Sequence, residues 1–169
     1  MNGLNVKWIA GLAVLLLAIG VYFLFSSFSS LPILQPTETI ELDDGERFSL
    51  SAEVVKRNWN GKLDEGYAYH FQSPGPLLKV KQGSKAWVDF KNNLPESTTV
   101  HWHGLRLDNQ YDGVPELTQE EILPGQSFSY ELSFPDAGLY WYHPHVREDK
   151  QQELGLYGAI LVQPTIPLL

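Results

Sequence analysis

Short runs of apolar and polar side chains typical of β-strands are spread along the chain beyond residue 38. In Arg47–Val54 the apolar residues occupy every second position, as in a β-strand with one buried face. Further candidate strands are Tyr67–Phe71, Lys79–Val80, Ala86–Phe90, Thr98–Trp102, Ser127–Phe134, Leu139–Tyr142 and Gly158–Val162. Turn-forming pairs such as Asn60-Gly61 and Asp112-Gly113 separate them. The pattern predicts an all-β domain, an antiparallel sandwich or Greek-key barrel, with a turn or two of helix around Asp149–Leu154.

The N-terminal part of the chain differs, because Trp8–Phe25 contains no charged side chain. Its length is close to the roughly 20 residues that an α-helix needs to span a bilayer. Lys7 precedes it, which favours an N-terminus inside the cell and a remainder outside, in the periplasm or at the cell surface. A cleaved signal peptide and a buried core helix are the alternatives, although signal peptides usually have an apolar run of only about 7–15 residues.

These patterns predict four regions along the chain. They are a membrane anchor or signal segment over residues 1–25, a tether over 26–38, the folded domain over 39–164 and a tail over 165–169.

Composition and charge narrow the possible functions. The chain of 169 residues has 20 acidic and 12 basic side chains and a net charge of −8. This argues against nucleic-acid binding, which requires a dense cationic surface to displace counterions. The chain has no cysteine, which excludes disulfides, cysteine nucleophiles and thiolate-ligated metal sites. Neither a G-x-x-x-x-G-K phosphate loop nor a G-x-S-x-G nucleophile elbow occurs.

Four of the five histidines form two close pairs, His101 with His103 and His143 with His145. Alternate residues of a strand face the same side, so each pair can present two imidazoles to one point. Imidazole is a good ligand for copper and zinc. The pairs therefore predict a metal site, with hydrogen-bonded core histidines as the alternative. These residues alone are also compatible with a zinc hydrolase that has histidine ligands. His70 has no such neighbour and is interpreted as a structural residue.

Several short motifs surround these pairs. His101–Gly104 is H-W-H-G, Tyr140–His145 is Y-W-Y-H-P-H, and the elements D-G-V-P, T-Q, P-G-Q-S-F and G-L-x-G-x-x-x-V occur between and after them. In this order they closely resemble the N-terminal domain of multicopper oxidases, the laccase-like family, and the similarity extends from about Thr39 to Gln163. The resemblance implies a cupredoxin-like Greek-key β-barrel, copper as the cofactor and an oxidase that reduces dioxygen to water.

The resemblance also implies roles for individual residues. His101 corresponds to a ligand of the type 2 copper. His103 and His143 correspond to ligands of one type 3 copper, and His145 to a ligand of the other. Asp112, in the D-G-V-P element, corresponds to an acidic residue that delivers protons to the trinuclear copper site, with a plain Asp-Gly turn as the alternative.

Two features of the family are missing from this sequence. The type 1 copper, where electrons enter, needs a cysteine thiolate, and the chain has no cysteine. The other half of the trinuclear ligand set comes from H-x-H and H-C-H motifs in a C-terminal domain, and no histidine follows His145. We therefore expect an N-terminal oxidase domain that is completed by a C-terminal domain or partner chain and is inactive alone. The alternatives are a stand-alone extracytoplasmic copper-binding or delivery domain and a non-catalytic cupredoxin scaffold.

Overall fold

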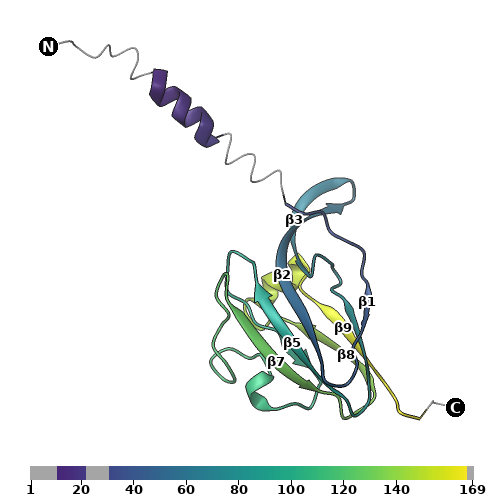
Figure 1. Ribbon diagram of the computed structural model, residues 1–169. Helices are drawn as coiled ribbons and strands as arrows, with labels where there is room; N and C mark the ends of the chain where they lie inside the picture. The colour runs from purple at the N-terminus through teal and green to yellow at the C-terminus, as the bar shows by residue number, and fades with distance from the viewer. Residues whose placement is uncertain (1–10, 22–30, 167–169) are drawn as a thin grey trace. The chain divides into compact units, whose positions relative to one another are not determined.

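The computed structural model describes residues 11–21 and 31–166, which divide into two units at Leu31 and Pro32 (Figure 1). The described part of the first unit is a helix over residues 11–21. The predicted apolar segment Trp8–Phe25 also includes residues 8–10 and 22–25, which lie outside the described residues. Within residues 11–21 and 31–166, no helix combines the length and the apolar character needed to cross a bilayer. Residues 26–30 of the predicted tether and 167–169 of the predicted tail also lie outside the described residues.

The second unit is a sandwich of two β-sheets (Figure 1). The first sheet consists, in spatial order, of β3 (Lys62–Tyr69), β2 (Glu46–Trp59), β5 (Lys85–Asn92) and β7 (Ser127–Ser133). The second consists of β1 (Thr39–Glu41), β4 (Leu77–Lys81), β9 (Gly158–Gln163), β8 (Gly138–His143) and β6 (His101–His103). A 3-10 turn, η1 (Asn109–Tyr111), follows β6, and a short helix, α2 (Glu148–Leu154), joins β8 to β9.

The mostly β architecture is confirmed, and each predicted strand segment lies on or overlaps one of these strands. The helical turn predicted around Asp149–Leu154 is confirmed as α2. Strand β1 and the turn η1 were not predicted. Ile33 and Gln35, which belong to the predicted tether, form isolated bridges to Lys56 and Gln72 of the domain.

The strands are not all antiparallel, so the antiparallel sandwich, one of the two predicted architectures, is wrong in this respect. The pairs β1–β4, β2–β5 and β4–β9 are parallel. The pairs β2–β3, β5–β7, β6–β8 and β8–β9 are antiparallel. Alternation along a strand identifies its buried face but carries no information about the direction of the neighbouring strand.

The hairpin of β2 and β3 was only partly predicted. Its two-residue turn, Asn60-Gly61, has positive φ at both positions, 51° and 83°, as in the type I′ turns typical of tight hairpins. The predicted strands stopped at Val54 and resumed at Tyr67. Residues 58–65, at the end of the hairpin, are all exposed, so this part has no buried face to produce an alternating pattern.

The core lies between the two sheets and fixes the orientation of β6. Trp102 is completely buried, with its ring 5.4 Å from Tyr130 of β7 and 5.6 Å from Tyr142 of β8, measured between ring centroids. Burial of a tryptophan at such a position contributes roughly 3–5 kcal/mol. Because successive residues of a strand face opposite sides, the buried Trp102 turns His101 and His103 to the outer face of the sheet.

Candidate metal centre

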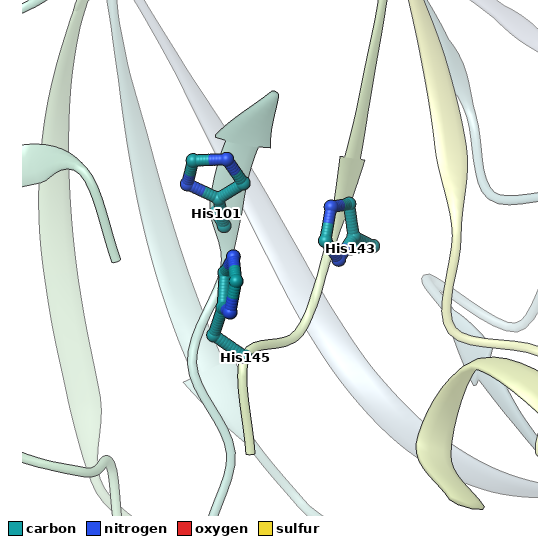
Figure 2. A group of neighbouring side chains, drawn as sticks. All are labelled: His101, His143 and His145. Atoms are coloured by element: carbon teal, nitrogen blue, oxygen red, sulfur yellow. The ribbon is translucent and has the colours of Figure 1, made fainter. Parts of the chain in front are cut away.

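Strands β6 and β8 bring the histidines of both motifs together. Their antiparallel register sets three pairs of residues opposite one another: His101 and His143, Trp102 and Tyr142, and His103 and Trp141. Since the middle pair faces the core, the other two pairs share the outer face of the sheet. His145 lies just beyond the end of β8, next to this face (Figure 2).

His101, His143 and His145 form a compact cluster (Figure 2). One possible ligand atom from each ring lies within 4.8 Å of those from the other two. The ring centroid of His101 is 5.3 Å from that of His143 and 4.6 Å from that of His145. The more exposed His103 adjoins the cluster, since its Nδ1 lies 3.3 Å from Nε2 of His143. All four predicted metal-ligating histidines are therefore neighbours.

His70 lies elsewhere and has different surroundings. Its ring centroid is 5.7 Å from that of Phe48 and 6.3 Å from that of Phe71. It is not a member of the histidine cluster formed by residues of β6 and β8.

Each ring of the cluster has its Nδ1 atom beside an oxygen acceptor. The three distances are 2.7 Å from His101 to the carbonyl of Asp112, 2.9 Å from His143 to the carbonyl of Pro144, and 2.7 Å from His145 to Oε1 of Glu148. An imidazole that donates its Nδ1–H keeps the Nε2 lone pair free, and metal-ligating histidines are commonly held in this way. The surroundings of His101 and His145 thus favour the Nδ1–H tautomer, which leaves Nε2 available to a metal. The ring of His143 has further neighbours, since its Nδ1 also lies 3.1 Å from the amide nitrogen of Gln152 and its Nε2 lies 3.3 Å from Nδ1 of His103.

The environment of His143 favours a neutral ring. Burial lowers the pKa of His143, and charge repulsion from His101 and His145 acts in the same direction, against the hydrogen bond to Pro144. Trp141 stacks on the His143 ring with centroids 4.0 Å apart and covers it from solvent. A neutral, shielded imidazole can donate its lone pair to a metal without first losing a proton.

The donor atoms in this cluster fit copper. The three converging side chains are all histidines, and imidazole nitrogen suits copper and zinc, whereas magnesium and calcium take oxygen ligands. An electron-transfer copper site of the type 1 kind also needs a thiolate. The sequence has no cysteine to supply one.

Asp112 contacts the cluster through both its backbone and its side chain. Its carbonyl oxygen accepts the hydrogen bond from His101 described above, and its Oδ1 lies 3.4 Å from the same Nδ1 atom. Its side chain is 31% exposed, so the carboxylate reaches both the ring of His101 and water.

Helix α2 supports the histidines and was not recognised as part of the site from the sequence. Gln151 is completely buried; its Oε1 accepts a hydrogen bond from Thr98 Oγ1 at 2.8 Å, and its Nε2 donates to Ser97 O at 2.9 Å. Lys150 Nζ lies 2.9 Å from both carboxylate oxygens of Glu96. These contacts fix α2 to the loop that leads into β6. The only sequence signal for a role of α2 in the site is its start three residues after His145.

Glu96→Gln is expected to lower the free energy of unfolding by about 1 kcal/mol at pH 7. Partial burial acts to raise the pKa of Glu96, but hydrogen bonds from Lys150 and Tyr67 outweigh it and hold the pKa below 4.5. The stability from this carboxylate is present above pH 4.5 and is lost as the pH falls through the folded-state pKa. Urea unfolding of both proteins at several pH values should show the difference shrinking in acid. A difference independent of pH would contradict this expectation, and Glu153→Gln is the control at an exposed position.

A two-sheet sandwich that presents a cluster of imidazoles on one sheet face defines a metal-binding β-domain, and comparisons with known proteins identify its family. The family model described as Multicopper oxidase matches residues 52–166. The chain therefore belongs to the multicopper oxidase family, a family of copper-binding proteins. The predicted family and its cupredoxin-like domain are confirmed.

Individual relatives agree with this assignment. Copper resistance protein A of Escherichia coli is 32% identical over 99% of this chain and 26% of its own length. Multicopper oxidase MmcO of Mycobacterium tuberculosis is 38% identical over 70% of this chain and 23% of its own length. The chain thus spans about a quarter of the length of these curated relatives.

Solved structures show the same fold. A multi-copper oxidase from Pseudomonas thermotolerans matches with a TM-score of 0.70 and 37% identity, over 76% of this chain and 31% of that one. Blue copper oxidase from Nitrosomonas europaea also gives a TM-score of 0.70, with 35% identity over 74% of this chain and 41% of that one. The domain described here therefore corresponds to one part of larger copper oxidases.

Proposed function

We propose that this chain supplies half of the ligands of a trinuclear copper site, at which dioxygen is reduced to water while a substrate is oxidised. The observation that carries the proposal is the convergence of His101, His143 and His145, each with an oxygen acceptor beside its Nδ1 atom. Copper bound there would supply the one-electron redox chemistry that dioxygen reduction requires. The residues of the chain bind and orient the metal and exclude water.

In this proposal each histidine has a separate role. His101 binds the type 2 copper, His103 and His143 bind one type 3 copper, and His145 binds the other. The 3.3 Å between Nδ1 of His103 and Nε2 of His143 supports a shared ion for that pair. The stacked ring of Trp141 keeps water away from His143, which protects the site from competing ligands.

Asp112 is proposed as the residue that relays protons to this site. Dioxygen reduction consumes protons, and a carboxylate in contact with water can hold one at Oδ1 and pass it on. The position of Oδ1, 3.4 Å from His101 Nδ1 and partly exposed to solvent, supports this role.

The remaining ligands are proposed to come from a C-terminal multicopper oxidase domain, in the same or a partner chain. The outer face of β8 carries exposed apolar side chains beside the cluster, Leu139 at 77% and Trp141 at 37% exposure, and such surface favours contact with another protein surface. We also propose that the domain works outside the cytoplasm, in the periplasm or at the cell surface. Trp8–Phe25 would serve there as a membrane anchor or signal segment.

Copper loading and dioxygen uptake test the proposed function. The full chain is expressed alone or together with a multicopper oxidase C-terminal domain that carries H-x-H and H-C-H motifs, with a phenol or Cu(I) as the reductant. We expect the chain alone to bind copper without consuming dioxygen, and the pair to consume it. A pair that gains neither copper nor dioxygen uptake would contradict the proposal.

A stand-alone copper-binding or delivery function is the second candidate. The specific observation in its favour is that three histidines of one chain already converge within 4.8 Å. Strong copper binding by the chain alone, unchanged when a C-terminal domain is added, would favour this function over the oxidase.

A further inference from the structure

Glu148, the first residue of α2, contacts the ring of His145 directly. Its Oε1 lies 2.7 Å from His145 Nδ1, although the carboxylate is 45% exposed at its outer side. The neighbouring cation, Arg147, pairs with Asp149 rather than with Glu148, at 3.0 and 3.1 Å.

The same face of α2 also reaches the second ring of the cluster. Gln152 follows Glu148 by four residues, so both side chains lie on one side of the helix. The Nε2 atom of Gln152 is 3.1 Å from His143 Nδ1 and 3.4 Å from Glu148 Oε2. One helix face thus contacts the Nδ1 side of two proposed copper ligands.

The position of this face is fixed by the rest of the helix. The buried Gln151 and the ion pair of Lys150 with Glu96 attach α2 to the loop before β6. Arg147 adopts a left-handed backbone conformation, with φ at 42°, and this turns the chain from His145 directly into the helix. Glu148 is therefore held beside His145 by contacts that do not involve the histidines.

We propose that Glu148 is a positioning residue that selects the Nδ1–H tautomer of His145 and fixes its ring before any metal binds. A neutral imidazole can carry its proton on either nitrogen, and only the tautomer with the proton on Nδ1 leaves Nε2 free for copper. The carboxylate accepts that proton's hydrogen bond and also makes the ring a stronger donor. This inference rests on the proposed function of the histidine cluster, and it assigns to the chain a carboxylate–histidine pair outside the recognised motifs.

The test measures the tautomer and the copper affinity separately. Nitrogen-15 NMR of the histidine rings, on the metal-free full chain in detergent micelles, identifies the tautomer; titration with Cu(II) against a chromophoric chelator gives the affinity. In Glu148→Ala we expect the Nδ1–H tautomer of His145 to lose its predominance and the copper affinity to fall by about 10- to 100-fold. Glu148→Gln keeps an acceptor oxygen and should retain the tautomer. Glu153→Ala removes an equal charge from an exposed position of the same helix and should behave as wild type.

Several outcomes overturn the inference. A folded Glu148→Ala protein with an unchanged His145 tautomer would do so, and so would an unchanged copper affinity. If Glu148→Ala does not fold, Glu148→Lys replaces it; a lysine would donate to Nδ1, so His145 should shift to the Nε2–H tautomer, and failure to shift overturns the inference. If wild type binds no copper, the proposed function fails, while the tautomer in metal-free protein still tests Glu148.

Discussion

Replacing His143 by alanine is expected to lower the Cu(II) affinity of the chain by more than about 100-fold. His143 is buried at the centre of the histidine group, beside His101, His103 and His145. Loss of a partner that only orients a metal ligand already costs roughly 10- to 100-fold in affinity, so loss of a ligand should cost more. Titration with Cu(II) against a chromophoric chelator, on protein whose fold is checked by circular dichroism, measures the effect.

His70→Ala is the matched control, because this histidine lies between aromatic rings rather than in the cluster. It should leave copper affinity unchanged. Equal copper affinities for wild type and a folded His143→Ala protein would show that the histidine cluster is not the copper site. A loss shared equally by His70→Ala and His143→Ala would point to surface histidine binding instead.

Gly113→Ala is expected to lower the free energy of unfolding by about 3 kcal/mol or more. Gly113 has φ at +80°, and a Cβ atom built on it would overlap the carbonyl group of Val100 and lie 2.9 Å from the backbone nitrogen of His101. The clash involves backbone atoms, so no side-chain rotation can relieve it. The same change should weaken copper binding, since the neighbouring Asp112 carbonyl holds the ring of His101. Urea unfolding and Cu(II) titration measure the two effects.

Gly45→Ala separates backbone strain from the steric clash. Gly45 has nearly the same φ, +81°, but a Cβ atom there would meet nothing within 4 Å. We expect Gly45→Ala to cost only about 1 kcal/mol, the usual cost of a left-handed non-glycine residue. Similar losses for the two variants would show that the Gly113 loop can move away from Val100.

The sequence contained enough information for most of the strands and for each histidine pair, but not for their assembly. Alternation in Arg47–Val54 marks a buried face because every second side chain enters the core. It cannot show that β2 lies parallel to β5, because that depends on long-range packing. Likewise, each H-x-H motif predicts two imidazoles on one face, whereas the opposition of His101 and His143 depends on the register of β6 and β8. The resemblance to multicopper oxidases implied that both histidine pairs belong to one copper site, which periodicity could not show.

The contacts of α2 show a second limit of prediction from the sequence. The sequence predicted a helical turn there, and its polar residues gave no sign of a role in the site. Gln151 is completely buried only because it meets the backbone of Ser97 and the hydroxyl of Thr98. Glu148 meets His145 only because of the turn at Arg147. The contacts of Gln151 join groups more than 50 residues apart, and the contact of Glu148 depends on an irregular turn; neither leaves a periodic signal in the sequence.

In the three-residue strand β6, one apolar side chain determines which way the metal-binding histidines point. Trp102 stands between the two histidines of the first motif, and it fits only with its indole between the sheets. A slip of one residue against β8 would expose this indole and push both imidazoles into the core, because side chains alternate between the two faces. The burial of Trp102 thus fixes the register of β6 against β8. Hydrophobic burial of Trp102 therefore sets the position of the histidine pair without a contribution from the metal.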